Sequence, residues 1–457
     1  MSKKEYNTIL VASICLAITM MDMAMMAVAL PTITKEMNLY NLAPEWVINS
    51  FILSMASFGI ITGKLSDIYN PKSLVSAGII LFIISSIGCF FSLNYIQLII
   101  FRAFQGIGCI FFVTPVIKLL SIIFKKNYLS KAIGTATGFG SIGMIIAPVL
   151  SGQIIKYLSW RYIFLINIPL SIICLITLSK IHIKIPRNYN IKIDKLGFLF
   201  LALFLCSLVL LIMEAPKYNY NELWIEINII ITSIFLISFI MVERKKTNPL
   251  IAYKLFKKSK FILINILNIL IQAQSVTVIF CIMYSQISLG YSPTQTGLLF
   301  MPLYVLIAIS SFLSGGIIQK KGGYITMIIG AGFIFTGYIA TLILLPLKNY
   351  FSLLPVIIGS GISFSIFSNS LRVIAIESVP KKYSGLSIGI IGNLRQISGA
   401  ISIAILGSII SSSTLSKTIS IQPVEFYFGF QKVIILSSIV CFIILILSIY
   451  TYKHGEN

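Results

Sequence analysis

One acidic side chain, Asp22, lies in the middle of a long apolar run near the start of the chain. A carboxylate in the hydrocarbon of a bilayer is costly, so such a residue normally persists for a functional reason. Burial and a nearby cation act in opposite directions on the protonation of an acid, which allows it to take up and release a proton. We therefore expect Asp22 to be a proton site. The other acids lie in loops or near the ends of apolar runs.

Arg102 is the expected partner of Asp22, because the two residues lie at similar depths in their apolar runs. Measured from the ends that we assign to the outside, the two levels differ by about 5 Å at 1.5 Å per residue. An Arg to Asp pair would satisfy both charges, and protonation of Asp22 would free Arg102 to pair elsewhere. The alternative is a static pair that only holds two helices together.

A stripe of polar residues runs along the apolar segment 260–289. Asn265, Asn268, Gln272 and Ser275 have the spacing i, i+3, i+7, i+10, which puts them on one face of a helix. Lipid would not tolerate these groups, so the stripe should face an aqueous cavity or a polar contact with another helix. We predict that Asn265, Asn268 and Gln272 line a substrate cavity.

A second group of polar residues, Asn393, Arg395 and Gln396, lies in the apolar segment 384–410. Arg395 is roughly 16 Å from the inner end of this segment, and that half of the chain has no acid at a matching depth. An anion, a carbonyl group or Asp22 itself could be its partner. We assign Asn393 and Arg395 to the same cavity, together with Met26, whose thioether suits amphipathic ligands or simply packs.

Small residues repeat at helical spacing in the segment 132–155, which carries Gly143, Pro148 and Gly152. Such residues let helix backbones approach closely, and a proline adds a bend. We predict a helix on which two halves of the protein move. Tight packing in a rigid bundle is the alternative.

The composition requires these residues to be positioned by membrane-spanning helices. Of 457 residues, 57% are apolar and 11% charged, and the mean hydropathy is +0.97. This balance excludes an ordinary soluble enzyme. Apolar windows predict fourteen spans: 8–31, 46–63, 73–93, 96–121, 132–155, 159–179, 196–214, 224–242, 260–289, 296–318, 324–346, 352–376, 384–410 and 429–451.

The net charge of +22 comes from 35 basic residues, of which 24 fall in segments on the inner side if the N-terminus is cytoplasmic. The positive-inside rule therefore predicts that both termini are cytoplasmic, in a multi-pass protein of the plasma membrane. The basic excess is explained by topology and by attraction to anionic lipid rather than by nucleic acid.

Two loops recur about 252 residues apart. The stretch that begins at Gly63 and reaches Gly78 is similar to the stretch from Gly315 to Gly330, and a second similarity has nearly the same offset. We predict two homologous six-span halves, 1–179 and 259–457, with linkers and two inserted spans in 180–258. Two repeated halves are typical of alternating-access transporters.

Enzyme chemistry has little support. The two histidines, His182 and His454, lie in a loop and in the tail, so we expect no metal site within the spans. The sequence contains no GxxxxGK[ST] motif for ATP, and we expect no cofactor. An ion gradient is the expected source of energy.

These motifs resemble the major facilitator superfamily and, within it, the fourteen-span drug:proton antiporter family. Asp22 with Ala29-Leu30-Pro31 is similar to that family's first-span signature, and the segment from Trp160 to Pro169 to its W-R-W-I-F-x-I-N-x-P signature. Arg102, Gln105, Gly106 and Gly108 match the superfamily's fourth-span motif. The resemblance implies that Arg102 takes part in proton transfer, and we assign Gln105 to the substrate cavity.

The resemblance also bears on the moving parts. Gly143, Pro148 and Gly152 are similar to an antiporter motif that is associated with exporters. The loop from Gly63 to Lys72 is similar to the superfamily's signature loop, whose acid, here Asp67, would clasp the other half; Ile68, Asn70 and Pro71 depart from the pattern. We therefore assign Gly63 and Asp67 to the conformational switch.

The expected fold is an all-α polytopic membrane protein of the major-facilitator type. The expected function is proton-coupled export of amphipathic drugs or toxic small molecules by a monomer, with membrane lipid as its surroundings. Sodium could replace the proton. Export of an endogenous metabolite, lipid or peptide, and a receptor or scaffold that transports nothing, are the alternatives.

Overall fold

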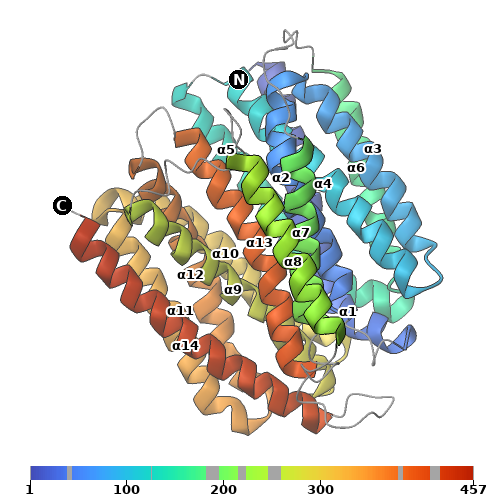
Figure 1. Cartoon of the computed structure of the whole chain (residues 1–457), viewed down its shortest axis with the longest axis vertical. Helices are drawn as coiled ribbons and strands as arrows, with labels where there is room; N and C mark the ends of the chain where they lie inside the picture. The colour runs from blue at the N-terminus through green and yellow to red at the C-terminus, as the bar shows by residue number, and fades with distance from the viewer. Residues whose placement is uncertain are drawn as a thin grey trace. The chain divides into compact units, whose positions relative to one another are not determined.

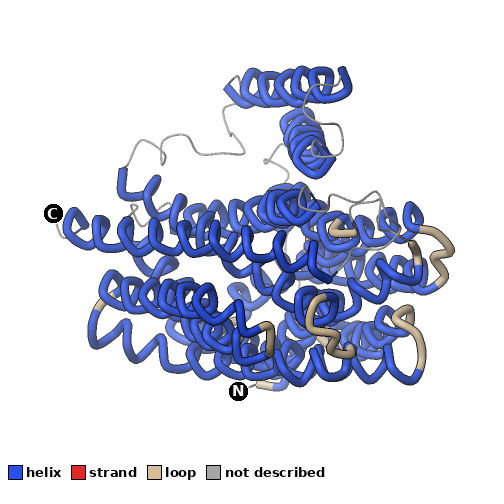
Figure 2. Tube along the Cα trace, turned by 90° about the horizontal axis from the view of Figure 1, so that it is seen from below, coloured by secondary structure: helices blue, strands red, loops and turns tan. Residues whose placement is uncertain are grey.

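The computed structural model describes residues 2–38, 44–124, 126–181, 195–214, 223–244, 259–378, 384–411 and 423–455. Within these residues the secondary structure is helical, without strands (Figures 1 and 2). The α-helices are α1 (Lys3–Glu36), α2 (Trp46–Ile68), α3 (Pro71–Phe90), α4 (Tyr95–Ile123), α5 (Lys126–Tyr157), α6 (Tyr162–Ser179), α7 (Lys195–Glu214), α8 (Leu223–Arg244), α9 (Ser259–Ile287), α10 (Pro293–Lys321), α11 (Gly323–Leu344), α12 (Leu354–Glu377), α13 (Ser384–Ser411) and α14 (Pro423–Gly455). Two short 3₁₀ helices, η4 (Leu345–Leu347) and η5 (Tyr350–Ser352), precede α12.

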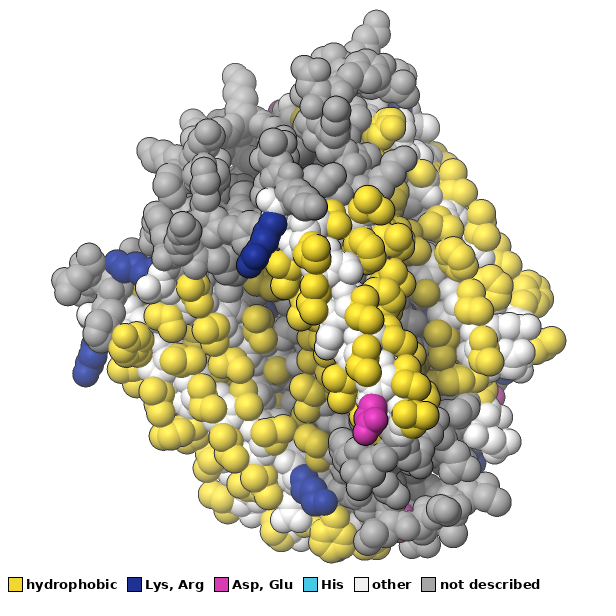
Figure 3. All heavy atoms as spheres, viewed as in Figure 1, with side chains coloured by type: hydrophobic (Ala, Val, Ile, Leu, Met, Phe, Trp, Pro, Cys, Tyr) yellow, Lys and Arg dark blue, Asp and Glu magenta, His cyan; other side chains and the backbone are white. Residues whose placement is uncertain are grey.

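Each of these helices coincides with one predicted span. In the described part of the chain, twelve helices are long and apolar enough to cross a membrane. Large apolar side chains remain exposed along them, and on the face shown in Figure 3 they outnumber the charged side chains. A soluble protein would not present such a surface, whereas lipid covers it. The all-α membrane fold is confirmed, and the count of fourteen spans stays a prediction.

Local signals set several of the helix ends. Ser2 and Glu5 form a capping box at the start of α1, and Ser292 and Gln295 form one at the start of α10. Gly322 separates α10 from α11 with a positive φ of 80°, a conformation that favours glycine. Polar residues therefore extend α1 and α10 beyond their apolar windows.

The contacts divide the chain into two compact units. Unit one comprises Met1–Cys206 and Phe235–Val242, and unit two comprises Ser207–Ile234 and Glu243–Asn457. Helices α1–α6 belong to unit one and α9–α14 to unit two, while α7 and α8 are divided between them. The boundaries predicted at 179 and 259 remain predictions.

The two units repeat one packing pattern. In unit one, α1 packs against α2, α4, α5 and α6, and α3 packs against α2, α4 and α6. In unit two, the helices numbered eight higher pack in the same combinations. Gly78 and Gly330 lie at the predicted repeat spacing and occupy equivalent contacts, against α4 and α12 respectively. This recurrence agrees with the predicted duplication.

Candidate functional site

Asp22 lies in α1 and is completely removed from solvent. Its Oδ2 atom accepts a hydrogen bond from Nη1 of Arg102, in α4, at 2.6 Å. Arg102 is also fully buried. The structure thus brings together the two residues that their depths suggested, as a buried ion pair. Their role in coupling stays a prediction.

Amide and hydroxyl groups from α3, α4 and α6 complete the surroundings of Asp22. Its Oδ1 atom accepts from Nδ2 of Asn167 at 3.2 Å and from Nε2 of Gln105 at 3.4 Å. The same Gln105 nitrogen donates to Oγ of Ser86 at 2.9 Å, and Oε1 of Gln105 accepts from Arg102 at 2.7 Å. We call Asp22, Arg102, Gln105, Asn167 and Ser86 the carboxylate network.

A second helix holds the guanidinium from another side. Nε of Arg102 donates to the backbone oxygen of Val47, in α2, at 3.0 Å. The guanidinium carbon lies 4.4 Å from the ring centroid of Phe51, one turn further along α2. An aromatic face stabilises a buried cation without competing for its in-plane hydrogen bonds. Arg102 therefore links α1, α2 and α4.

Close backbone contacts bring these helices together. A Cβ atom at Gly106 would overlap the backbone oxygen of Phe51, and one at Gly108 would lie 2.8 Å from the backbone nitrogen of Phe82. Larger residues would push α4 away from α2 and α3. The glycines of the fourth-span motif thus hold Arg102 and Gln105, one turn apart on α4, within reach of Asp22.

Two polar atoms of the network have no hydrogen-bond partner. Nη2 of Arg102 and Oδ1 of Asn167 are both buried and unpaired. Unpaired buried groups of this kind are uncommon and costly. The carboxylate network is therefore not saturated in this conformation, and it has a free donor and a free acceptor for another arrangement.

Helix α5 packs along the segment of α1 that carries Asp22. A Cβ atom at Gly143 would lie 3.0 Å from the backbone oxygen of Ala17, and Oγ of Ser151 donates to the backbone oxygen of Met25 at 3.0 Å. Pro148 and Gly152 are buried in the same helix. The predicted close approach of α5 is present, and its role in movement stays a prediction.

In unit two, the predicted polar residues join α9 to α13. Nε of Arg395 donates to Oε1 of Gln272 at 2.7 Å, and Nδ2 of Asn268 donates to the backbone oxygen of Ile391 at 2.9 Å. Asn265 is buried and donates to the backbone oxygen of Phe261 in its own helix at 2.7 Å. Of the partners suggested for Arg395, the structure provides a carbonyl group.

For four assigned residues the structure gives few contacts or none. Gly63 lies in α2 and has no atom within 4 Å of the position of a Cβ. Asp67 and Asn393 lie in α2 and α13, but their side chains are outside the described part of the structure. Met26 is fully buried in α1, four residues after Asp22. The assignments of these four residues stay predictions.

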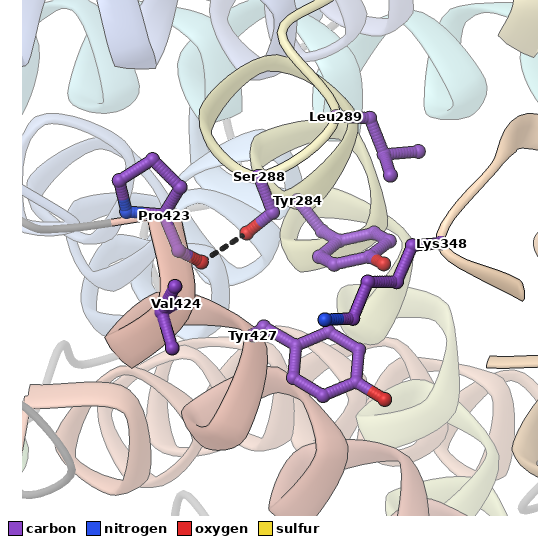
Figure 4. Close-up of a pocket in the computed structure, with 7 residues that line it drawn as sticks. All are labelled: Tyr284, Ser288, Leu289, Lys348, Pro423, Val424 and Tyr427. Carbon is purple, nitrogen blue, oxygen red and sulfur yellow. Dashed lines mark hydrogen bonds between the residues drawn. The ribbon is translucent and has the colours of Figure 1, made fainter. Parts of the chain in front are cut away.

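Unit two contains a small pocket whose lining includes none of the residues predicted for the site (Figure 4). It is lined by Tyr284, Ser288, Leu289, Lys348, Pro423, Val424 and Tyr427. The Lys348 ammonium extends between the two tyrosine rings, 4.9 Å from the ring centroid of Tyr427. Among the described residues, no group of three or more His, Cys, Asp or Glu side chains could hold a metal ion.

Reasoning from the sequence missed three contributors: Asn167, Ser86 and the Val47 carbonyl. Asn167 is an amide inside the apolar segment 159–179, and a search for polar residues in spans would have found it. Ser86 gave no signal, because many serines in spans bond only to their own helix. A backbone carbonyl gives none at all.

Comparisons with known proteins agree with this architecture. The model of the Major Facilitator Superfamily matches residues 12–403. The chain is 25% identical to multidrug resistance protein Stp of Mycobacterium tuberculosis over 426 residues, covering 90% of this chain and 77% of that protein. It is 26% identical to multidrug resistance protein 3 of Bacillus subtilis over 418 residues, covering 89% and 80%.

Solved structures share the fold. The crystal structure of a bacterial homolog of the human lysosomal transporter Spinster, inward-facing and unoccupied, superposes with a TM-score of 0.69. The match covers 99% of this chain and 98% of that one, at 12% identity. The chain therefore belongs to the Major Facilitator Superfamily, and it is a multi-pass membrane transporter rather than an enzyme.

Proposed function

We propose that the protein is a proton-coupled antiporter that exports amphipathic, drug-like small molecules by alternating access. The observation that carries this proposal is the buried carboxylate network, in which the acid Asp22 holds the cation Arg102. The names of the multidrug resistance relatives support the substrate class.

Protonation of Asp22 would change the balance of the network. Arg102 would lose its negative partner and keep the oxygens of Val47 and Gln105. A buried cation left without its counter-charge costs about 3–5 kcal/mol, so the protonated state favours another arrangement of Arg102. Because Arg102 links α1, α2 and α4, its movement would change how these helices pack. Proton binding is thereby coupled to conformation.

Asp22 is closed off from solvent in this structure. A proton can therefore reach it only in a conformation that opens the network to water. An alternating-access cycle supplies such openings, one on each side of the membrane. A static pair that only joins two helices would need none, and this difference separates the two interpretations.

The energy available sets a bound on transport. One proton that moves down a potential of about 100 mV supplies about 2.3 kcal/mol. This free energy sustains a gradient of less than about a hundredfold for a neutral substrate.

The proposal also includes the cellular location of the protein and its orientation in the membrane. The basic residues favour cytoplasmic loops, which supports a plasma membrane location with both termini in the cytoplasm. We include a monomer as the functional form. Reporter fusions at each terminus and the mass of the purified protein in detergent test these two points.

The decisive experiment is transport in proteoliposomes with imposed gradients. Wild type and Asp22→Asn are compared for uphill movement of cationic, neutral and anionic dyes, under a pH gradient and separately under a sodium gradient. We expect the pH gradient to drive wild type and to have no effect on Asp22→Asn. Rates are normalised to the amount of folded protein, because the variant leaves Arg102 without its counter-ion.

Glu36→Gln is the matched control, since Glu36 is the last residue of α1 and its side chain is about half exposed. This variant should keep uphill transport. Undiminished transport by Asp22→Asn would remove the proposal, and transport driven by sodium alone would replace the proton with sodium.

A further inference from the structure

Arg395 carries a positive charge inside unit two, and among the described residues it has no carboxylate partner. Its Nε atom donates to the neutral amide oxygen of Gln272 at 2.7 Å, and its guanidinium carbon lies 4.7 Å from the ring centroid of Phe364. Within the described residues its two terminal nitrogens make no hydrogen bond. The side chain is only partly buried. Its charge is therefore solvated by an amide and a ring but not neutralised.

Arg102, in unit one, is an arginine of the same protein whose positive charge is neutralised by a carboxylate. Both arginines lie in spans, and the guanidinium carbon of each lies over a phenylalanine ring, 4.4 Å and 4.7 Å from the ring centroid. Arg102 also has Asp22 at 2.6 Å. An uncompensated guanidinium in a span is expensive, and such residues mark sites that bind ions or substrates.

The stretch of unit two from residue 259 to residue 455, which contains Arg395, offers no suitable acid. From residue 259 to residue 455 the only acids are Glu377 and Glu425. Glu377 is the last residue of α12, and Glu425 lies in the first turn of α14. Both positions are helix ends, whereas Arg395 is eleven residues into α13.

The charged residue near Arg395 is also positive, so it increases the positive charge of this region instead of neutralising it. Arg372, in α12, is the charged residue that acts on Arg395. Nη1 of Arg372 donates to Oδ1 of Asn369 at 3.3 Å, and Asn369 in turn donates to Oγ of Ser314 at 2.8 Å. Arg372 thus also has only neutral partners in the described structure. Two cations with neutral partners produce a positive potential in this part of unit two.

We propose that Arg395 binds the anionic group of an amphipathic substrate, such as a carboxylate or a sulfonate. The Phe364 ring lies against the guanidinium without taking its hydrogen-bond donors, and the two terminal nitrogens, which make no hydrogen bond within the described residues, can hold two oxygens of one anion. Arg372 adds long-range attraction. The inference rests on the proposed export of amphipathic molecules and narrows their class to anions.

Binding of three probes that share one apolar body tests this inference without any ion gradient. The probes are 1-pyrenebutanoate, 1-pyrenebutanol and 1-pyrenebutylammonium, whose terminal groups are anionic, neutral and cationic. Their fluorescence anisotropy is measured with purified protein in lipid nanodiscs at pH 7.5, and the signal of empty nanodiscs is subtracted. Wild type should bind the carboxylate at least about tenfold more tightly than the alcohol, and the ammonium most weakly.

Variants then locate the source of the preference. Arg395→Gln should bring the carboxylate to within about threefold of the alcohol, and Arg395→Lys should retain part of the preference. Affinity for the alcohol reports whether each variant is folded. Lys348→Gln is the matched control, because it also removes a cation that lies over an aromatic ring of unit two; it should leave the preference unchanged.

The outcomes separate this inference from the proposed function. Equal binding of the three probes, or a carboxylate preference that survives Arg395→Gln, overturns the anion site even if uphill transport needs Asp22. An anion preference that depends on Arg395 supports the site, also when Asp22→Asn transports normally and proton coupling has failed.

Discussion

Oδ2 of Asp22 and Nη1 of Arg102 lie 2.6 Å apart at a point that no solvent reaches. The two residues are 80 positions apart in the chain and belong to different helices. Two charges this close and this deeply buried compensate each other. Removal of one partner therefore leaves a buried charge uncompensated and lowers stability more than removal of both.

A double-mutant cycle measures this dependence. Arg102→Gln should lower the free energy of unfolding by about 3–5 kcal/mol, because it leaves a buried carboxylate without its cation. The double variant Asp22→Asn/Arg102→Gln should be less destabilised than the sum of the two single variants, since no charge remains. Denaturant unfolding of the purified protein in detergent gives the values. Additive effects would show that the pair contributes nothing specific.

Three glycines predict a graded series of stabilities. A Cβ at Gly78 would lie 2.7 Å from the backbone oxygen of Gly108, one at Gly330 would lie 3.2 Å from Phe367, and one at Gly332 meets nothing within 4 Å. Gly78→Ala should therefore cost about 1–3 kcal/mol by overpacking, and Gly330→Ala less. Gly332→Ala should be neutral or stabilise by up to about 1 kcal/mol through helix propensity.

Thermal unfolding in detergent tests this order. The same ranking across both units would support equivalent packing of α3 on α4 and of α11 on α12. If Gly332→Ala proved as harmful as Gly78→Ala, the close contacts would not explain the glycines.

Asn167 should matter for coupling because it donates to Oδ1 of Asp22 at 3.2 Å. Asn167→Ala removes a direct hydrogen bond to the carboxylate that we propose as the coupling group, so pH-driven transport should fall several-fold. Ser171 is the control, since it lies one turn further along α6 and its buried hydroxyl has no partner. Ser171→Ala should transport like wild type. Equal rates for the two variants would exclude Asn167 from coupling.

Lys72 should stabilise the end of α6. Its Nζ atom donates to the backbone oxygens of Ser179 at 3.1 Å and Ile181 at 2.7 Å, where the last carbonyls of a helix need partners. Lys72→Met should lower the free energy of unfolding by about 1 kcal/mol, the net worth of a partly exposed hydrogen bond. Lys180→Met, at the same helix end but without a side-chain bond in the described structure, should cost less. Unfolding midpoints of the two variants decide between them.

The sequence predicts the structure well where residue type or residue count alone determines the position of a segment or side chain. Apolar windows located each helix, because lipid demands about 20 apolar residues whatever the fold. Asp22 and Arg102 could be matched by depth, since distance along a helix follows from residue count. Several helix ends were placed too far inside, because polar caps such as Ser2 with Glu5 extend helices past the membrane.

Which side chains meet across a helix interface depends on the rotation of each helix about its own axis. Gln105 was assigned to a substrate cavity, but which face of α4 meets Asp22 depends on the glycine contacts with α2 and α3. The polar stripe of α9 could face water or another helix, and for Asn268 and Gln272 the structure shows contacts with α13. A single sequence does not specify such rotations.

If Arg395 binds an anionic substrate, as we propose, the transport cycle is electrogenic. If a monovalent anion leaves the cell while one proton enters, both steps move charge in the same direction, and each cycle carries two elementary charges. A potential of about 100 mV would then contribute about 4.6 kcal/mol per turnover, enough for a substrate ratio of over about a thousandfold. Export would generate a measurable current, and voltage alone could sustain it with equal pH on both sides.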